Sequence, residues 1–220
     1  GTGKPGPGFR GPTGYLFLRF VDVVGWVRKH NPHCKFVIEN VVFDHIAQDW
    51  DMAHQLLGTP TQMDALKYSY TKRHRAFWHN IQLPEGWDTP LLGEDWAAVQ
   101  CLEKGWWPVH EGRTITAKWE GDPMNPQQKT GKPYLVTDGQ EVRYLRPREA
   151  EGLMGIECDS TAAPGVTPQQ RLHGIGNGMD INCLCQLLRH IRDGAVPPQE
   201  WDIAQQCNAP YVPQVAVGTG

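Results

Sequence analysis

The stretch Lys35-Phe36-Val37-Ile38-Glu39-Asn40-Val41 decides the fold expected of this chain. After Lys35 it carries three apolar residues, two of them β-branched, and this pattern predicts a short buried strand. The strand ends in a carboxylate and an amide. In open α/β sheets, active groups gather at the carboxyl ends of strands. Glu39 is therefore the first candidate site residue.

A second stretch, Arg73-His-Arg-Ala-Phe-Trp78, carries two arginines at alternate positions. If this stretch is extended, Arg73 and Arg75 point to the same side. A carboxyl group facing two guanidinium groups can hold a planar polar ligand such as a nucleobase. A plain salt bridge between neighbouring strands uses the same residue types. The residues alone leave both interpretations open.

Helices are expected before and after the first strand. Helical spacing of apolar residues predicts a helix from Tyr15 to about His30, ended by Asn31-Pro32. A second helix is predicted up to Leu57, with Gly58 at its C-terminal cap. Residues 1–14 are rich in Gly and Pro and are expected to form a loop. The expected buried residues are Leu16, Phe20, Val23, Val24 and Val27 in the first helix, and Ile46, Trp50, Ala53 and Leu57 in the second.

The composition changes after residue 80. Pro, Gly and Trp residues predict a loop-rich, mostly β unit over residues 81–140. Near its end, Tyr134 to Tyr144 is typical of a hairpin, with Asp138-Gly139 as the turn. A short helix is expected to open after Pro147. Residues 174–180 are expected to form a glycine-rich turn before a last helix with an apolar face of Ile181, Leu184, Leu188 and Ile191.

Charge and hydropathy narrow the class of protein. The 220 residues include 40% hydrophobic and 20% charged residues, which is ordinary for a soluble protein. The net charge of −3 argues against wholesale electrostatic binding of nucleic acid, although basic residues cluster locally. No apolar run is long enough to span a bilayer, so no membrane partner is expected. The local cluster consists of Lys67, Lys72, Arg73, His74 and Arg75.

The six cysteines form no CxxC pair. This spacing favours neither a zinc site nor a disulfide framework, so no metal is expected. A reducing compartment follows as the expected location. The chain also starts at Gly1 without an initiator Met, inside a Gly/Pro-rich run, and we expect it to be cut from a longer protein.

Taken together, these stretches resemble the DNA cytosine-5 methyltransferases over roughly residues 9 to 192. Ile38-Glu-Asn-Val41 resembles the family's Glu-Asn-Val signature, and Arg73 to Trp78 its paired-arginine motif. Gly14-Tyr-Leu-Phe-Leu-Arg-Phe20 resembles its Gly-x-Leu-Phe-Phe-acid segment. Two further segments resemble those that close the family's target-recognition domain, and a third segment resembles the family's final cofactor-side motif. These are Arg113-Thr-Ile-Thr116, residues 145–155, and Gly176-Asn-Gly178 with Asn182.

The resemblance implies a fold and a domain order. The fold is a Rossmann-like S-adenosylmethionine-dependent methyltransferase domain of the α/β class, present here in part, with a small, mostly β target-recognition domain inserted. Residues 1–80 would be the C-terminal part of the catalytic domain and residues 81–140 the target-recognition domain. Residues 141–192 would return to the catalytic domain, and residues 193–220 would form a tail.

The implied reaction transfers a methyl group from S-adenosylmethionine to carbon 5 of a cytosine flipped out of duplex DNA. The resemblance gives Glu39 a role at the cytosine ring nitrogen and Arg75 at its carbonyl oxygen, with Arg73 supporting the site. Asn177, Gly176 and Gly178 would lie on the cofactor side. The residues expected on the substrate side are Asn40, Arg113, Thr114 and Thr116.

The chain departs from the family in several places. The nucleophile belongs to a Pro-Cys motif, but none of the six cysteines follows a proline. The glycine-rich loop for the cofactor is also not found, and Arg19 stands where the family usually carries an acid. We therefore expect the chain alone to be inactive and poorly soluble, and to require a complementary N-terminal half or subunit.

Three alternatives stay open. A tRNA cytosine-5 methyltransferase shares these motifs, and a non-catalytic regulatory relative would tolerate Arg19. The subunit of a split methyltransferase would carry the same residues as a truncated enzyme. The expected location is cytoplasmic for a bacterial or phage protein, in restriction-modification or self-protection, or nuclear for a eukaryotic one.

Overall fold

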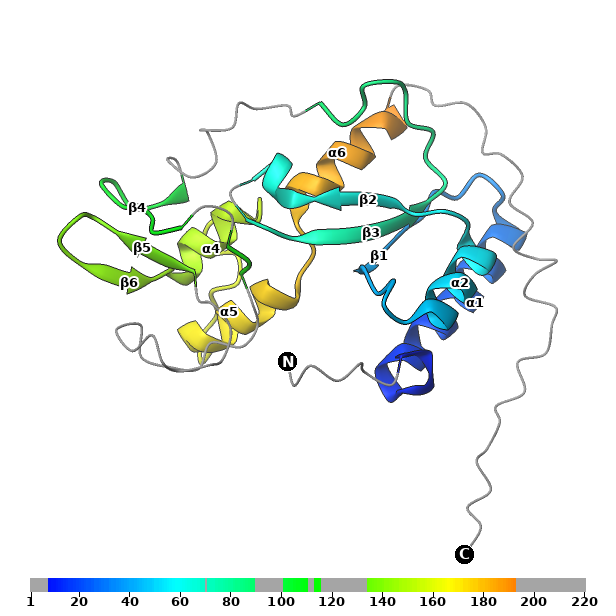
Figure 1. Ribbon diagram of the computed structural model, residues 1–220, viewed down its shortest axis with the longest axis horizontal. Helices are drawn as coiled ribbons and strands as arrows, with labels where there is room; N and C mark the ends of the chain where they lie inside the picture. The colour runs from blue at the N-terminus through cyan, green and yellow to red at the C-terminus, as the bar shows by residue number, and fades with distance from the viewer. Residues whose placement is uncertain (1–7, 70, 90–100, 111–112, 116–133, 193–220) are drawn as a thin grey trace, which may run out of the picture.

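Strand β1 (Val37–Val41) forms within the stretch on which the sequence analysis centred. It is the edge of a three-stranded sheet of order β1-β3-β2, in which β3 (His74–His79) lies between β1 and β2 (Thr61–Asp64). The computed structural model describes residues 8–69, 71–89, 101–110, 113–115 and 134–192. These segments contain both helices and strands (Figure 1), so the expectation of a mixed helix and strand protein is confirmed.

Both pairings in this sheet are antiparallel. Doubly wound α/β sheets are built mostly from parallel strands. The three described strands therefore do not by themselves establish a Rossmann-like order, and that part of the expected fold class stays a prediction.

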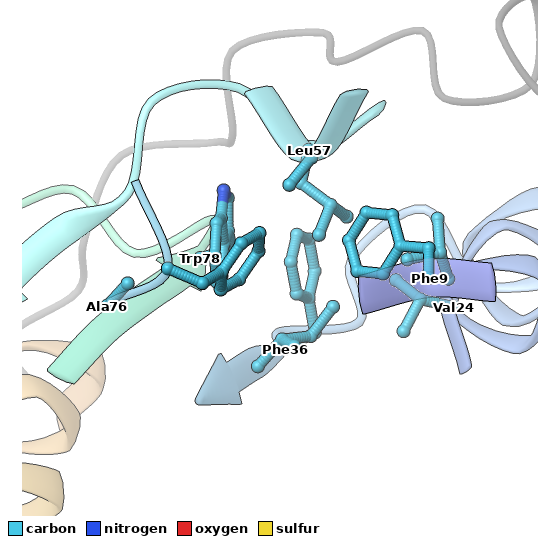
Figure 2. Packing of buried hydrophobic residues seen from close by; sticks show 10 residues of the cluster. Phe9, Val24, Phe36, Leu57, Ala76 and Trp78 are labelled. Carbon is cyan, nitrogen blue, oxygen red and sulfur yellow. The ribbon is translucent and has the colours of Figure 1, made fainter. Parts of the chain in front are cut away.

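One face of the sheet is covered by α1 (Pro12–His30) and α2 (Ala47–Leu57). Because side chains alternate along a strand, Ala76 and Trp78 of β3 both point to this side, and both are fully buried. Figure 2 shows Trp78 packed with Phe36 and Leu57, with Phe9 and Val24 beside them. These side chains join the two helices to the sheet in one apolar cluster.

Four aromatic rings hold this layer together. Phe43 and Trp50 lie edge to face with ring centroids 5.0 Å apart, and Trp50 and Trp78 lie 5.7 Å apart. Phe17 of α1 contacts Trp78 at 5.7 Å. The Trp78 indole N–H donates to the backbone carbonyl of Gly58, 3.0 Å away, so its polar atom is satisfied in the core.

The opposite face of the sheet packs against α6 (Ile181–Arg192). Met63 and Phe77 from the strands meet Cys183 and Leu187 from this helix. The sheet therefore lies between two helical layers, which is the usual way for an α/β sheet to bury both faces.

A second, smaller sheet has the order β4-β5-β6, with β4 at Trp107–Pro108, β5 at Leu135–Thr137 and β6 at Val142–Tyr144. The predicted hairpin is confirmed: β5 and β6 pair antiparallel around Asp138-Gly139. The Asp138 carboxylate accepts from the backbone N–H groups of Gln140 and Glu141, and Gly139 has a φ of 94°. Glycine adopts this left-handed geometry without steric cost.

The small sheet packs against α4 (Pro147–Leu153) and α5 (Pro168–Asn177). α4 begins at Pro147, where a helix was expected to open. α5 begins with a capping box, because Thr167 and Gln170 each bond the other's backbone N–H. The division of the chain at residues 80, 140 and 192 stays a prediction.

The buried face of α1 differs from the expected one. Val21 and Val24 are buried, whereas Leu16, Phe20 and Val23 are exposed, with Trp26 exposed by 65%. The predicted face was wrong at three positions because α1 is apolar on more than one side, so spacing alone did not select the side that meets the sheet. The helix also begins at Pro12, inside the expected loop, because proline suits the first helical turn.

The last two helices also differ from expectation. Gly174 and Gly176 belong to α5, so the expected glycine-rich turn is reduced to residues 178–180. On α6, Leu188 and Ile191 are exposed, whereas Gln186 and His190 are buried. The Gln186 amide donates to the carbonyl of Thr89, 2.9 Å away, and this bond makes a buried polar side chain tolerable.

Two short 3-10 helices complete the described elements, η1 at Gly8–Arg10 and η2 at Ala65–Lys67. A search of the described helices found none with the length and apolar character needed to cross a membrane.

Candidate active site

Glu39 and Arg75 meet across two neighbouring strands. Glu39 lies opposite Phe77 and Arg75 lies opposite Val41, so the two are diagonal neighbours on the α6 side of the sheet. Their side chains are only 14% and 18% exposed, and Arg75 Nε lies 2.8 Å from Glu39 Oε1. In this structure the pair has the geometry of the salt bridge that the sequence left as one of two interpretations.

The pair keeps some capacity for further hydrogen bonds. Glu39 Oε1 is buried and makes no hydrogen bond of good geometry with the described residues, although it lies within ion-pair distance of Arg75. Buried polar atoms without a hydrogen bond are uncommon in folded proteins, and such atoms often mark functional positions.

Arg73 is brought close to the pair but is bound elsewhere. It immediately precedes β3 and is 5% exposed. Its guanidinium donates to the carbonyls of Gly176, 3.2 Å away, and Gly178. Burial, and then the neighbouring charge of Arg75, lower the pKa of Arg73. Its contacts are those of a positioning residue.

Asn40 follows Glu39 on β1 and is held by its own strand. Its side-chain oxygen accepts from the Val41 backbone N–H at 2.8 Å. This bond satisfies a backbone donor at the edge of the sheet, so in this structure Asn40 shapes the end of the strand. A role for Asn40 on the substrate side stays a prediction.

The expected cofactor residues lie at the end of α5. Asn177 is exposed, and its amide nitrogen lies 3.1 Å from the Nε2 atom of His173. The carbonyls of Gly176 and Gly178, on either side of it, are taken by Arg73. Within this segment, the side chain of Asn177 is therefore the group presented outward.

Two of the expected substrate residues lie beside the arginine segment. Arg113 forms a parallel bridge with Thr71, and its carbonyl accepts from Lys72 N–H at 3.2 Å. The Thr114 hydroxyl donates to the Lys72 carbonyl at 2.7 Å. Thr114 lies 42 positions from Lys72 in the chain, and this bond brings it next to the arginine segment. The remaining expected substrate residue, Thr116, lies outside the described residues.

Asp180 was missed by the sequence analysis. It is 3% exposed and lies within hydrogen-bond distance of the hydroxyls of Ser69 and Thr71, 3.3 Å from each. Burial raises the pKa of Asp180 to about 6, against the opposing effect of hydrogen bonds from Cys183, Asn182 and Thr71. The available signal was an Asp just before a helix, which predicts a cap and nothing about burial.

Cys183 also lies on the α6 side of the sheet, in the apolar cluster with Phe77. Burial raises the pKa of its thiol well above the ordinary value, and the charges of Asp180 and Asp64 add to this effect. A thiol that stays protonated at neutral pH is a poor nucleophile. Cys183 is therefore a core residue and does not supply the reactive thiolate.

Two buried carboxylates in α4 have structural partners. The pKa of Glu149 would be raised by burial, but bonds from the Arg143 side chain and the backbone N–H of Arg146 outweigh this and lower it. Glu151 accepts from Arg171, 3.0 Å away, and from the backbone N–H of Thr161. Both carboxylates are already fully engaged in holding α4 to its neighbours.

Comparison with known proteins adds a distant structural similarity to this geometry. No family model matches the chain, and no curated protein matches it. Among solved structures, the chain is similar to one described as the methyltransferase EhMeth of Entamoeba histolytica, at 16% identity and a TM-score of 0.44. The match covers 73% of this chain, which spans about three fifths (62%) of that protein. A similarity of this size leaves the function to be argued from the site.

Proposed function

We propose that this chain is the C-terminal portion of an S-adenosylmethionine-dependent methyltransferase that modifies carbon 5 of a cytosine flipped out of duplex DNA. The observation that carries the proposal is the Glu39–Arg75 pair, which is largely buried and retains a carboxylate oxygen without a good hydrogen bond. The proposal follows from the resemblance of both motifs to the DNA cytosine-5 methyltransferases.

The pair suits the polar edge of cytosine. A protonated Glu39 can donate to the ring nitrogen N3, and the Arg75 guanidinium can donate to the neighbouring carbonyl oxygen. Nucleophilic addition to the ring places negative charge on these two atoms. A proton donor and a fixed positive charge at these positions lower the barrier for that step. Thymine carries a hydrogen on the same nitrogen and loses the first bond.

The cofactor would lie at the end of α5, where Asn177 is exposed. Bound S-adenosylmethionine would supply an electrophilic methyl group. The described residues suit one wall of such a pocket, because Asn177 offers an outward amide while Gly176 and Gly178 are already bonded to Arg73. We assign only this contact to the chain.

The thiolate and the remaining cofactor contacts would come from a complementary segment or subunit. Three features support this partner. β1 pairs only with β3 among the described strands, so its other edge can accept a strand. Cys183, in the cluster on this side of the sheet, is kept protonated by burial. The outer side of α1 exposes Tyr15, Leu16, Phe20, Val23 and Trp26.

Binding of a displaced cytosine tests the proposal without methyl transfer. The probe is a DNA duplex with one cytosine opposite an abasic site, which is easily extruded, and the comparison probe carries thymine there. We expect tighter binding of the cytosine probe. Arg75→Ala should weaken binding of both probes by about 10- to 100-fold, since the carbonyl oxygen is common to cytosine and thymine and a hydrogen bond to a charged group is worth ~1.5–3 kcal/mol.

Two variants serve as controls for this measurement. Glu39→Gln retains a donor for N3 and should still bind the cytosine probe, whereas Glu39→Ala is expected to bind the two probes alike. Arg19→Ala removes an arginine on the exposed side of α1 and should change nothing. Equal binding of cytosine and thymine by the unmodified chain would contradict the proposal. Tighter binding of tRNA than of the duplex would favour the tRNA enzyme instead.

A further inference from the structure

The start of α6 is joined to the loop before β3 by one buried carboxylate. Asp180 Oδ1 accepts from the Cys183 backbone N–H at 3.2 Å and caps the helix. Its other oxygen, Oδ2, lies 3.3 Å from the hydroxyl oxygens of both Ser69 and Thr71. These two hydroxyls lie 2.9 Å from each other. A single side chain thus bonds two segments more than 100 residues apart.

Arg73 bridges the same two segments in the opposite direction. Its guanidinium extends from the position just before β3 and donates to the carbonyls of Gly176 and Gly178, on the link between α5 and α6. We call Ser69, Thr71, Arg73 and Asp180, with these two carbonyls, the latch. One polar side chain from each segment therefore reaches the other segment.

The two ends of the latch are the two halves of the candidate site. Arg73 is two residues from Arg75, which pairs with Glu39. Asn177 lies between the two carbonyls that Arg73 holds. A helix cap alone does not require a buried polar side chain on each side, because well-packed apolar residues are commonly as stabilising as buried polar partners. What the polar side chains add is directional bonding at defined positions.

We propose that Asp180 and Arg73 are positioning residues, which fix the residue 176–178 segment relative to the strand that carries Arg75. A pH dependence of the latch follows as a consequence, because the Asp180 carboxyl is buried between the two segments. The functional meaning of the two ends rests on the function proposed above. The latch itself does not depend on it.

The direction of the pH effect follows from burial. Burial raises the pKa of Asp180 to about 6, and the carboxyl would return toward its ordinary value of 3.8 if the link left the sheet. The docked state therefore favours the protonated form. Docking is strongest at low pH, weakens as pH rises from about 4 to about 6, and stays at the weaker level above that.

The charged and titratable groups around Asp180 must be known before a pH step can be assigned to its carboxyl. Arg73 faces it from the segment before β3, and Cys183 faces it from α6; Asp64 and Glu39 act on the same Cys183 thiol. Cys183 stays protonated throughout this range, because its pKa is raised. Asp64 and Glu39 are carboxylates too. A pH step can therefore be assigned to Asp180 only with a variant that removes the Asp180 charge alone.

Hydrogen exchange of the 220-residue chain between pH 4.5 and 7.5, corrected for intrinsic rates, measures the latch directly. We expect protection of the Gly178, Cys183 and Leu184 amides to fall with rising pH, by at most about 100-fold, since each unit of pKa difference contributes about tenfold. Amides of α2 serve as the internal reference and should show no such step.

Variants at position 180 decide the outcome. Asp180→Asn keeps both hydrogen-bonding positions without the charge, so it should retain protection and show no pH step. Asp180→Ala should lose protection at every pH. Arg73→Lys cannot reach two carbonyls with a planar fork and should lose protection at Gly178. A pH step unchanged in Asp180→Asn, or undiminished protection in Asp180→Ala, would overturn the latch.

The cytosine-binding assay separates this inference from the proposed function. We expect Asp180→Ala to weaken binding of the cytosine probe and Asp180→Asn to restore it. An intact pH step in a chain that shows no cytosine preference would refute the function and leave the latch standing. A clear cytosine preference with exchange that is insensitive to position 180 would refute the latch alone.

Discussion

The Nε atom of Arg75 lies 2.8 Å from Oε1 of Glu39, diagonally across β1 and β3, with both side chains largely shielded from water. Shielding makes the attraction stronger than in an exposed pair. A double-mutant cycle with Glu39→Ala and Arg75→Ala, measured by urea unfolding, should give a coupling free energy of about 1–3 kcal/mol. The exposed Arg19–Asp22 pair, 3.4 Å apart in α1, is the matched control, with an expected coupling below about 0.5 kcal/mol.

Neighbouring valines in α1 should respond in opposite ways to the same substitution. Val24 is 7% exposed and packs in the core, so Val24→Lys should lower the free energy of unfolding by about 3 kcal/mol or more. Val23 is 53% exposed, so Val23→Lys should change stability by no more than about 0.5 kcal/mol. Val23→Lys should also raise solubility by interrupting an apolar surface. Equal losses of stability would contradict the orientation of α1.

Trp78 should be the most sensitive aromatic residue in the described core. It is fully buried, contacts Phe17, Phe43 and Trp50, and donates to Gly58. Trp78→Ala should therefore cost about 3–5 kcal/mol of unfolding free energy. Trp26→Ala on the exposed side of α1 should cost less than about 0.5 kcal/mol. Thermal or urea unfolding of the two variants provides the measurement.

Acid should weaken the packing of α4 through Glu149. Arg143 and two backbone N–H groups hold the pKa of Glu149 below its usual value despite burial, so the folded state favours the ionised carboxylate. This stabilisation is fully present above the ordinary pKa of 4.5 and is lost as pH falls through the lower folded value. Unfolding midpoints measured from pH 7 down to pH 3 should fall less steeply in Glu149→Gln. A variant as acid-sensitive as the parent chain would refute this assignment.

Elements whose hydrophobic or turn pattern allowed only one interpretation were predicted well. In α2, Ala53 and Leu57 are buried as expected, and Gly58 has a φ of 80° after the helix. The hairpin around Asp138-Gly139 was identified because turn chemistry is local. The pairing of Glu39 with Arg75 was also foreseeable, because alternation along strands fixes the side to which each residue points.

The errors arose where tertiary contacts decide between equivalent patterns. α1 and α6 carry apolar residues on several sides, so the buried side depends on what the sheet presents. Asp180, just before α6, bonds Ser69 and Thr71, and Gln186 on α6 bonds Thr89; these buried bonds favour a side that hydropathy alone rejects. The destination of the Arg73 side chain was equally hidden, because the carbonyls it reaches lie more than 100 residues away.

The edge-to-face contact between Trp50 and Trp78 gives the protein a built-in optical reporter. Two indoles 5.7 Å apart couple in their excited states, and the resulting circular dichroism depends on their relative orientation. One ring belongs to α2 and the other to β3, so the signal follows the joint between helix and sheet rather than the unfolding of either element alone. The spectral difference between the parent chain and Trp50→Phe isolates this contribution, so assembly of the helix on the sheet can be followed without an added label.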